Sequence, residues 1–381
     1  MRVDSLALRD FRNIEALELT PDPRFNVIVA PNGHGKTNLV EAVYLLAALK
    51  SFRSLKNDAL IRHGAERARC TALVDRGGVR REIALELLPR SRRVTLNGNS
   101  VRRVADFFGE VNVVAFSPED IGLVRGAPAD RRAVVDRMVF NAHPSYAAES
   151  AALDDVLKNR NAVLKQCEGS VSRRNADLLD IYDAQLVAHG VAVVARRRNY
   201  LARLAAPFHD AFCEIFGATF DAALAYRLKS AEDATDHDEL LSDDAALTEH
   251  LRDAIRAARP RDVARGFSTV GPHRDDIEPL LQGRPLREFG SQGQHRAFVL
   301  AMKISEIRLL EAALGHFPVL VLDDVSSELD PIRNQQLFDF LSRFDGQVFI
   351  TTTDVGYIRL QHAFRQWHLR DGVLLDPSAS A

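Results

Sequence analysis

A glycine-rich loop near the N-terminus constrains this chain more than any other stretch. Residues 30–38 read Ala-Pro-Asn-Gly-His-Gly-Lys-Thr-Asn, and they follow an apolar run at residues 25–29 and precede a helix-like apolar pattern. Strand, glycine-rich loop, Lys-Thr and helix, in that order, are the context that a phosphate-binding loop requires. Its backbone N–H groups point at phosphate oxygens, and the helix N-terminus adds partial positive charge.

Each position of this loop therefore becomes a candidate nucleotide contact: Ala30, Pro31, Asn32, Gly33, His34, Gly35, Lys36, Thr37 and Asn38. The Lys36 ammonium group is expected to reach the β- and γ-phosphates, and the Thr37 hydroxyl is expected to bind Mg²⁺. Ala30 stands where this motif usually has its first glycine. If that position requires a positive φ, alanine costs on the order of 1 kcal/mol. The His34 side chain is expected to be a solvated tip without a catalytic role.

Size and composition are those of an ordinary soluble globular protein. The chain has 381 residues, 46% of them hydrophobic and 27% charged, which is long enough for two domains or one large one. No stretch approaches ~18 consecutive apolar residues, so we expect no transmembrane helix, and the N-terminus does not resemble a secretory signal. The three scattered cysteines lack metal-ligand spacing and fit reduced cytosolic thiols.

Charge alone does not decide whether the protein binds nucleic acid. The net charge of −2 gives no overall attraction to DNA. All but seven of the 50 basic residues are arginine. Guanidinium groups suit phosphate contacts, but codon usage in a GC-rich genome explains the same bias.

Strand patterns lie at both ends of the chain. Residues 3–8 and 14–19 predict two strands around a polar turn, and period-two alternation from Ala72 to Val101, with Gly77-Gly78 and Asn97-Gly98 as turn signals, predicts an antiparallel meander. Its turns carry several arginines, read either as a solvated rim or as a phosphate-contacting patch: Arg90, Arg92, Arg93, Arg102 and Arg103. Apolar runs near 319–322 and 347–351 predict buried parallel strands, and residues 366–375 are expected to complete that sheet.

The middle of the chain shows no strand pattern. Residues from about 130 to 257 have helical apolar spacing and predict an antiparallel helical arm. We therefore expect an inserted helical arm at 129–257, and a discontinuous α/β domain formed by 1–128 and 258–381. The acidic segment at 232–249 is expected to be a solvated connection.

Two further motifs belong with the phosphate loop. Asp323 and Asp324 follow a predicted strand, at the sheet edge where α/β folds place ligands. Asp323 is expected to organise Mg²⁺ and Asp324 to polarise the attacking water, although paired acids at such an edge also serve as helix caps. Ser291-Gln292-Gly293-Gln294 precedes a helix and forms either a second anion site or a helix cap.

Taken in order, these motifs and Ser327-Glu328-Leu329-Asp330 resemble the head of ABC-type ATPases. The resemblance implies an α/β fold: an ABC-type P-loop ATPase head, with a mixed sheet and an antiparallel meander lobe, plus the inserted helical arm. It implies ATP and Mg²⁺ as cofactors, with Lys36 and Asp324 catalytic, Thr37 and Asp323 as metal ligands, and Ser291, Gln292, Gly293 and Gln294 contacting the γ-phosphate held by another subunit. ATP then joins a two-fold dimer, and hydrolysis releases it.

A closer resemblance is to the RecF family of bacterial recombination mediators, from the N-terminus to about residue 353. It is carried by the phosphate loop, Ser-Gln-Gly-Gln and further matching segments at residues 8–13, 50–53, 116–120, 180–186, 271–276 and 322–330. The transporter branch of the superfamily is more compact, and the SMC branch has a long coiled coil where this chain has a short helical segment.

RecF-family resemblance implies a cytoplasmic, ATP-dependent DNA-binding protein with weak ATPase activity that dimerises on ATP. Its partners would be single-stranded and gapped or junction DNA, RecR and, indirectly, RecA, in gap repair, replication and the SOS response. Candidate DNA contacts are the five turn arginines with Arg131 and Arg132.

Two alternatives to this function are weighed against the same sequence. One is an ABC-type ATPase coupled to a membrane partner, against which the missing membrane span and the large helical insert argue. The other is a clamp that does not hydrolyse ATP, against which the presence of Lys36, Asp323 and Asp324 argues.

Overall fold

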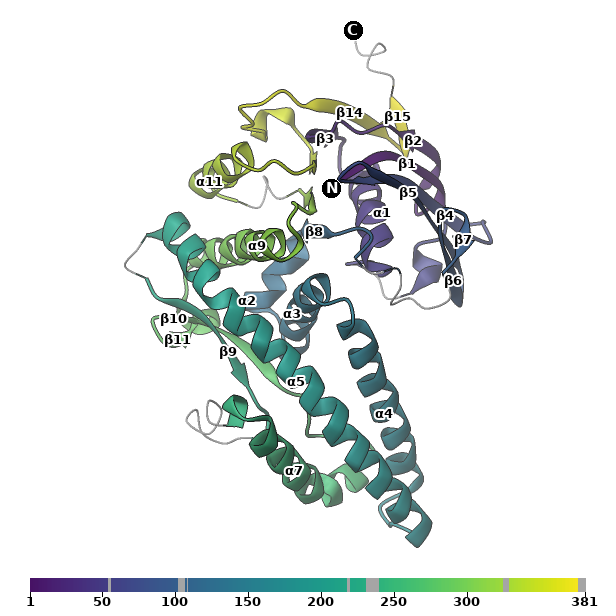
Figure 1. Cartoon of the computed structure of the whole chain (residues 1–381), viewed down its shortest axis with the longest axis vertical. Coiled ribbons are helices and arrows are strands. Elements are labelled where there is room, and N and C mark those ends of the chain that lie inside the picture. Colours follow the sequence, from purple (N-terminus) through teal and green to yellow (C-terminus); the bar gives the residue numbers. More distant parts are fainter. Residues whose placement is uncertain are drawn as a thin grey trace. The chain divides into compact units, whose positions relative to one another are not determined.

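The computed structural model describes residues 1–53, 56–101, 107, 109–217, 220–230, 240–324 and 329–375. These form two compact units (Figure 1). The first contains residues 1–120, 214–216 and everything from Gln292 onward, and the second contains residues 121–213 and 217–291. The boundaries expected at 128/129 and 257/258 both fall inside the second unit.

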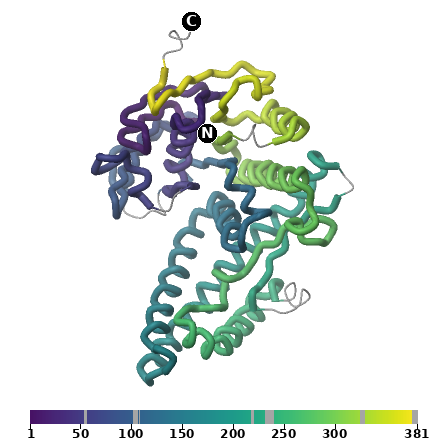
Figure 2. Tube along the Cα trace, turned by 180° about the vertical axis from the view of Figure 1, so that it is seen from behind, coloured from purple at the N-terminus to yellow at the C-terminus, as the bar shows by residue number. Residues whose placement is uncertain are grey.

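One six-stranded sheet of the first unit carries the phosphate loop. Its order is β15-β14-β3-β13-β12-β8, with only β15 antiparallel to its neighbour. The strands are β3 (Phe25–Val29), β8 (Val113–Phe116), β12 (Val319–Asp323), β13 (Val348–Thr352), β14 (Arg365–Arg370) and β15 (Val373–Leu375). Every residue of β12 and β13 is buried, as both apolar runs predicted. The N-terminal β3 and the C-terminal β14 lie side by side (Figures 1 and 2).

The second sheet of this unit is the predicted meander. All its neighbouring strands are antiparallel, in the order β2-β1-β4-β5-β6-β7. The strands are β1 (Arg2–Phe11), β2 (Ile14–Leu19), β4 (Ala68–Arg76), β5 (Val79–Leu88), β6 (Ser91–Leu96) and β7 (Asn99–Ser100). Positive φ angles at both Gly77 and Gly78, and at both Asn97 and Gly98, give the tight hairpin turns that the sequence indicated.

Helix α1 (Lys36–Ala48) packs against strands of both sheets, including β8, β12 and β13 of the first and β4 and β5 of the second. Eleven of its residues are buried, so it forms the core of this unit. Helix α9 (Gln292–Leu314) contacts β8 and α11 (Pro331–Ser342). Three 3₁₀ turns complete the unit at Asn57–Ala59 (η1), Pro118–Ile121 (η3) and Val355–Tyr357 (η4), the last residue of η3 lying in the second unit.

The second unit is mainly helical. Its helices are α2 (Gly122–Arg125), α3 (Pro128–Ala142), α4 (Tyr146–Gln166), α5 (Arg173–Phe216, ending in the first unit), α7 (Asp244–Arg265) and α8 (Leu286–Phe289). It also holds a three-stranded sheet of β9 (Ala222–Arg227), β10 (Asp276–Leu281) and β11 (Arg284–Pro285). The expectation that residues 130–257 contain no strand is therefore wrong at β9. Its sequence, Ala-Ala-Leu-Ala-Tyr-Arg, favours a helix locally, but pairing with β10 overrides that preference.

A buried arginine ties three helices of the second unit together. Arg160 of α4 is fully buried and donates hydrogen bonds to Asp183 of α5 (2.6 Å), Asp262 of α7 (2.8 Å) and Ser268 (2.7 Å). A buried charge is tolerated only when it is paired in this way, so the network fixes how the helices pack.

Among the described residues one helix, α5, has the length and composition that a membrane span requires. About 33% of its apolar 18-residue stretch is buried inside the protein. A single such helix is weak evidence, because core helices of soluble proteins meet the same criterion. Arg196 and Arg197 of α5 pair with Glu149 and Asp136 within the second unit.

Candidate nucleotide-binding site

The phosphate loop leaves β3 and turns through two left-handed glycines. The Ala30 N–H donates to the Thr352 carbonyl of β13 (3.2 Å), which anchors the start of the loop to the sheet. Gly33 and Gly35 have φ angles of +87° and +99°. A Cβ atom at Gly35 would lie 2.7 Å from Asn13 Oδ1, so both backbone conformation and space require glycine there.

Ala30 shows none of the backbone strain that was considered because it stands where the motif usually has glycine. Its φ is not among the positive values of the chain, and the residue is 2% exposed in the core. The turn of the loop is made later, at Gly33 and Gly35, where left-handed geometry is needed. Alanine at position 30 is therefore compatible with a phosphate-binding loop.

Lys36 begins α1, and no carboxylate among the described residues pairs with its ammonium group. The residue is 4% exposed, and its Nζ donates to Asn32 Oδ1 (2.5 Å) and to the Ala30 carbonyl (3.4 Å). Both acceptors are neutral groups of the loop itself. A buried ammonium group that has only neutral partners favours the arrival of an anion.

Thr37 and Asp323 bring two oxygen atoms together at the edge of the sheet. The Thr37 hydroxyl donates to Asp323 Oδ1 (2.8 Å), and so does the hydroxyl of Thr351 on β13 (2.8 Å). Burial raises the pKa of the Asp323 carboxyl above its ordinary value, and these two hydrogen bonds oppose that shift. A nearby divalent cation would stabilise the charged carboxylate.

The donor set fits Mg²⁺ bound with a nucleotide better than a resident metal centre. Over the described ranges there is no group of three or more His, Cys, Asp and Glu side chains that could hold a metal ion. Mg²⁺ is commonly held by one or two protein oxygens, with phosphate and water oxygens completing its octahedron. The hydroxyl of Thr37 and the carboxylate of Asp323 are such a pair.

Asp324 adopts a left-handed conformation, with a φ of +51°. Its backbone N–H donates to the Thr351 hydroxyl (2.9 Å), so one threonine orients both acids. The N-cap of α11 is Asp330, whose carboxylate accepts from Ile332 N and Arg333 N. Ser327 and Glu328 of this motif lie outside the described residues.

The Ser-Gln-Gly-Gln segment lies at the start of α9, as predicted. The helix begins at Gln292; Ser291 and Gln292 are exposed, and Gly293 and Gln294 are half-buried. The first N–H groups of a helix lack intrahelical acceptors. An exposed helix start of this kind is suited to contact an anion presented by another subunit.

His34 is not the solvated tip that the sequence suggested. Its Nδ1 lies 3.0 Å from Asp371 Oδ1 and 3.2 Å from the Asp371 backbone nitrogen, and the Gly372 N–H donates to the His34 carbonyl (3.0 Å). Asp371 and Gly372 form the turn between β14 and β15, with φ angles of +50° and +80°. This turn therefore holds the tip of the phosphate loop, a contact between residues more than 330 positions apart.

Gly372→Ala is expected to weaken ATP binding about fivefold. An added Cβ would lie 2.6 Å from the Asn13 carbonyl and would also strain the positive φ, so the turn must shift away from His34 at a cost of about 1 kcal/mol or more. Gly283→Ala is the matched control, because it has the same kind of turn (φ +69°) with open space around it. Equilibrium ATP titration of both variants measures the effect. Wild-type affinity in Gly372→Ala would show that the turn does not position the loop.

The candidate DNA contacts separate into different groups. Arg131 is 6% exposed and forms a two-point ion pair with Asp276 (2.7 and 2.6 Å), and Arg132 donates to the Asp275 carbonyl. Both make contacts inside the second unit, and their assignment as DNA contacts stays a prediction. Arg90, Arg92 and Arg93 are exposed near the β5–β6 turn, and Arg102 and Arg103 lie outside the described residues.

The segment at 271–276, which carried part of the resemblance, has a structural role. Asp275 accepts hydrogen bonds from the Tyr226 hydroxyl (2.9 Å) and the Lys229 N–H (2.9 Å). Burial raises the pKa of its carboxyl to about 6, and burial lowers the pKa of His273 to about 4. Asp275 is therefore engaged in hydrogen bonds inside the second unit.

The sequence motifs did not predict three described residues that contribute to the site: Thr351, Asn13 and Asp371. Thr351 was the easiest of the three to predict, because it ends a predicted strand and pairs in register with Asp323. Asn13 and Asp371 lie in turns whose neighbours depend on the whole sheet.

Comparison with known proteins agrees with this geometry. A family model described as the RecF/RecN/SMC N-terminal domain matches residues 2–371. The DNA replication and repair protein RecF of Geobacter sulfurreducens is 42% identical over 364 residues, which cover 95% of each chain. This chain belongs to the RecF family. RecF of Myxococcus xanthus is 43% identical over 94% of this chain and 92% of the relative.

Solved structures place this RecF-family chain in the same fold. A structure described as the recombination mediator protein RecF with ATP in the RecFOR pathway superposes with a TM-score of 0.83 at 28% identity, covering 98% of both chains. Its complex with the ligand named ATPrS gives a TM-score of 0.87 at 28% identity, covering 98% of this chain and 97% of that one. The Smc head domain of Pyrococcus furiosus (TM-score 0.51, 15% identity, covering 98% of this chain and 94% of that one) shares the fold alone. The predicted ATPase-head fold is confirmed.

Proposed function

We propose that this RecF-family protein is an ATP-dependent DNA-binding protein of recombinational gap repair. The observation that carries the proposal is the joint geometry of the phosphate loop. Lys36 is buried with neutral partners among the described residues, and at the next residue the Thr37 hydroxyl lies 2.8 Å from Asp323 Oδ1. Relatives named DNA replication and repair protein RecF support the repair assignment, and the structure of a relative with ATP supports the nucleotide.

Different residues of the site would bind the phosphates, bind Mg²⁺ and activate water. Lys36 and the backbone N–H groups of residues 32–38 would hold the phosphates, while Thr37 and Asp323 would hold Mg²⁺ beside them. The metal would neutralise charge that develops between the β- and γ-phosphates. Asp324 would orient and polarise the attacking water, giving a weak, DNA-dependent ATPase that acts as a switch.

Ser291 to Gln294 would complete the site across a homodimer, contacting the γ-phosphate bound by the other subunit. The exposure of Ser291 and Gln292 at the start of α9 supports this assignment. ATP would then control dimerisation, and the dimer would bind single-stranded and gapped or junction DNA. We further propose a cytoplasmic location and a role with RecR in helping RecA to load, in gap repair, replication and the SOS response.

DNA titrations test this function directly. Gapped, single-stranded and duplex DNA are titrated with the full chain, with and without ATP, at two salt concentrations. ATP is expected to tighten binding to gapped DNA, and higher salt to weaken it because phosphate contacts release counterions. An affinity for gapped DNA that responds to neither ATP nor salt would refute the proposal.

Ser291→Arg is expected to abolish the ATP-induced doubling of mass while each subunit still binds ATP within about twofold of wild type. The longer, charged side chain would crowd the contact with the second subunit's nucleotide. Ser145→Arg is the matched control, because Ser145 is an exposed serine at the start of α4 that makes no capping hydrogen bond. Light scattering with and without ATP reports the mass. A Ser291→Arg protein that still doubles in mass would disprove the contribution across the dimer.

A further inference from the structure

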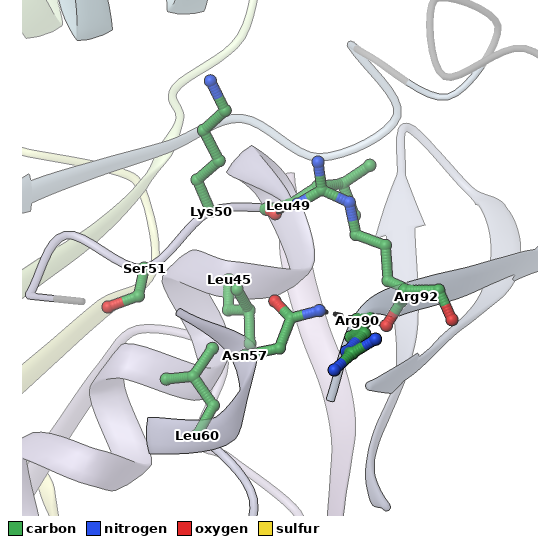
Figure 3. A pocket seen from close by; sticks show the side chains of 9 residues that line it. Leu45, Leu49, Lys50, Ser51, Asn57, Leu60, Arg90 and Arg92 are labelled. Atoms are coloured by element: carbon green, nitrogen blue, oxygen red, sulfur yellow. Dashed lines mark hydrogen bonds between the residues drawn. The ribbon is translucent and has the colours of Figure 1, made fainter. Parts of the chain in front are cut away.

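A basic pocket lies in the first unit beside the C-terminal end of α1. It has a volume of about 300 Å³ and is bounded by α1, the segment after it, η1 and the turn from β5 to β6 (Figure 3). Its lining residues are Leu45, Leu49, Lys50, Ser51, Asn57, Leu60, Arg90, Ser91 and Arg92. Three of them are basic and none is acidic.

No described acidic residue neutralises the positive charge of this pocket. Neither Lys50 nor Arg90 has an ion pair in the part of the chain that the structure describes. Arg92 donates to the Leu49 carbonyl at the end of α1 (Figure 3) and so counters the negative end of the helix dipole. Lys50 and Arg90 are then left to attract an anion.

The pocket is also built before any ligand arrives. The Asn57 amide donates to the carbonyls of Leu88 (3.1 Å) and Ser91 (3.0 Å), which fixes the turn that carries Arg90. Leu45, Leu49 and Leu60 are buried beneath it. Only the long basic side chains must be ordered on binding, which keeps the entropic cost low.

This pocket is separate from the proposed nucleotide site. Lys36 begins α1, whereas Leu49 follows its last residue, and a helix of 13 residues spans roughly 20 Å. An anion in the pocket would therefore not be a phosphate of the ATP held by the same loop.

A second hollow on the same sheet also contains basic residues, but acidic residues neutralise them. Four arginines line it, but so do Asp10, Glu66 and Glu86. Arg62 pairs with Asp10 (2.7 Å) and Arg67 with Glu86 (3.0 Å). Arginine content alone therefore does not distinguish the first pocket; its lack of acids does.

We propose that the pocket of Lys50, Arg90 and Arg92 binds a phosphate group, and that its source is the DNA backbone. The DNA part of this inference rests on the proposed function. Ammonium and guanidinium groups on a rigid turn bind phosphodiesters without reading bases, so the contact would be independent of sequence. It would add affinity and position DNA on the meander side of the ATPase head.

The double variant Lys50→Gln with Arg90→Gln tests the site in the full chain. Arg92 is left intact because it caps α1. The matched control is Arg9→Gln with Arg69→Gln, which removes two exposed arginines from the second hollow. Both proteins are compared with wild type by fluorescence anisotropy on labelled gapped DNA with ATP across a salt series, and equilibrium ATP binding confirms that each is folded.

The pocket variant is expected to bind DNA about tenfold more weakly near 0.1 M salt, with the slope of log K against log salt reduced by about 1 to 2. The control variant is expected to stay within about twofold of wild type. Equal DNA binding by the pocket variant and wild type would overturn DNA as the source. An equal loss in both double variants would also overturn it, because it would reveal a general electrostatic effect.

Inorganic phosphate separates a free anion from the DNA backbone and also separates this inference from the proposed function. At constant ionic strength, phosphate titrated into each protein is followed by thermal unfolding. If wild type binds no DNA, the proposed function fails. A phosphate-dependent rise in Tm that only the pocket variant lacks would then establish a free-phosphate site. No such difference, together with unchanged DNA binding, would exclude a phosphate site altogether.

Discussion

Lys36→Ala is expected to abolish measurable ATP binding and, with it, the ATP-dependent part of DNA binding. The Lys36 ammonium group is buried at the start of α1, and its partners among the described residues are the Asn32 side chain and the Ala30 carbonyl. Substitution by alanine removes the positive charge with which the loop is expected to bind phosphate. Hydrogen bonds to charged groups contribute about 1.5–3 kcal/mol each, so we expect affinity to fall about a hundredfold or more.

The fold should tolerate this change. Both partners of Lys36 are neutral, so alanine leaves no uncompensated charge behind, unlike the loss of Arg160 from its two aspartates. Lys158→Ala, at an exposed position of α4, is the matched control. Isothermal titration with ATP and Mg²⁺ measures affinity, and thermal unfolding checks the fold. A well-folded Lys36→Ala protein with wild-type affinity would refute the nucleotide site.

Contiguous sequence was sufficient to find the phosphate loop and much of the fold. The loop works through neighbouring backbone N–H groups, so its residues must be adjacent in the chain. The parallel strands β12 and β13 begin with apolar runs because both faces are covered. The strands of the meander alternate in polarity and are separated by tight turns that contain glycine. These signals are local, and a sequence displays them directly.

Contacts set by the register of distant strands could not be read in the same way. Thr351 reaches Asp323 only because β12 and β13 pair in one register. Asp371 meets His34 because β14 lies beside β3 and ends in a turn there. The alanine-rich β9 is a strand only through its pairing with β10.

Charge patterns were ambiguous for a related reason. Arg131 and Arg90 look alike in the sequence, yet Arg131 is buried and pairs with Asp276, whereas Arg90 remains exposed. An arginine's role depends on whether folding brings an acid to it. The composition of the chain, with nearly balanced Lys+Arg and Asp+Glu, cannot reveal that.

Asp324→Asn is expected to reduce single-turnover ATP hydrolysis by about 10²- to 10⁴-fold while ATP binding and dimerisation persist. Asparagine suits this position because Asp324 has a φ of +51°, a conformation that asparagine tolerates better than most residues. Its backbone N–H would still donate to Thr351, so the substitution removes the charge and keeps this backbone contact.

Asp323→Asn is the informative comparison for this variant. Asp323 accepts hydrogen bonds from Thr37 and Thr351 and is the expected Mg²⁺ ligand, so its substitution should weaken Mg²⁺-dependent ATP binding as well as hydrolysis. Asp324→Asn should separate the two properties, because the water-activating group is not needed to hold the nucleotide. Unchanged hydrolysis in Asp324→Asn would assign water activation to another residue. If wild type hydrolysed ATP no faster than Lys36→Ala, the result would instead support a clamp that binds ATP without hydrolysing it.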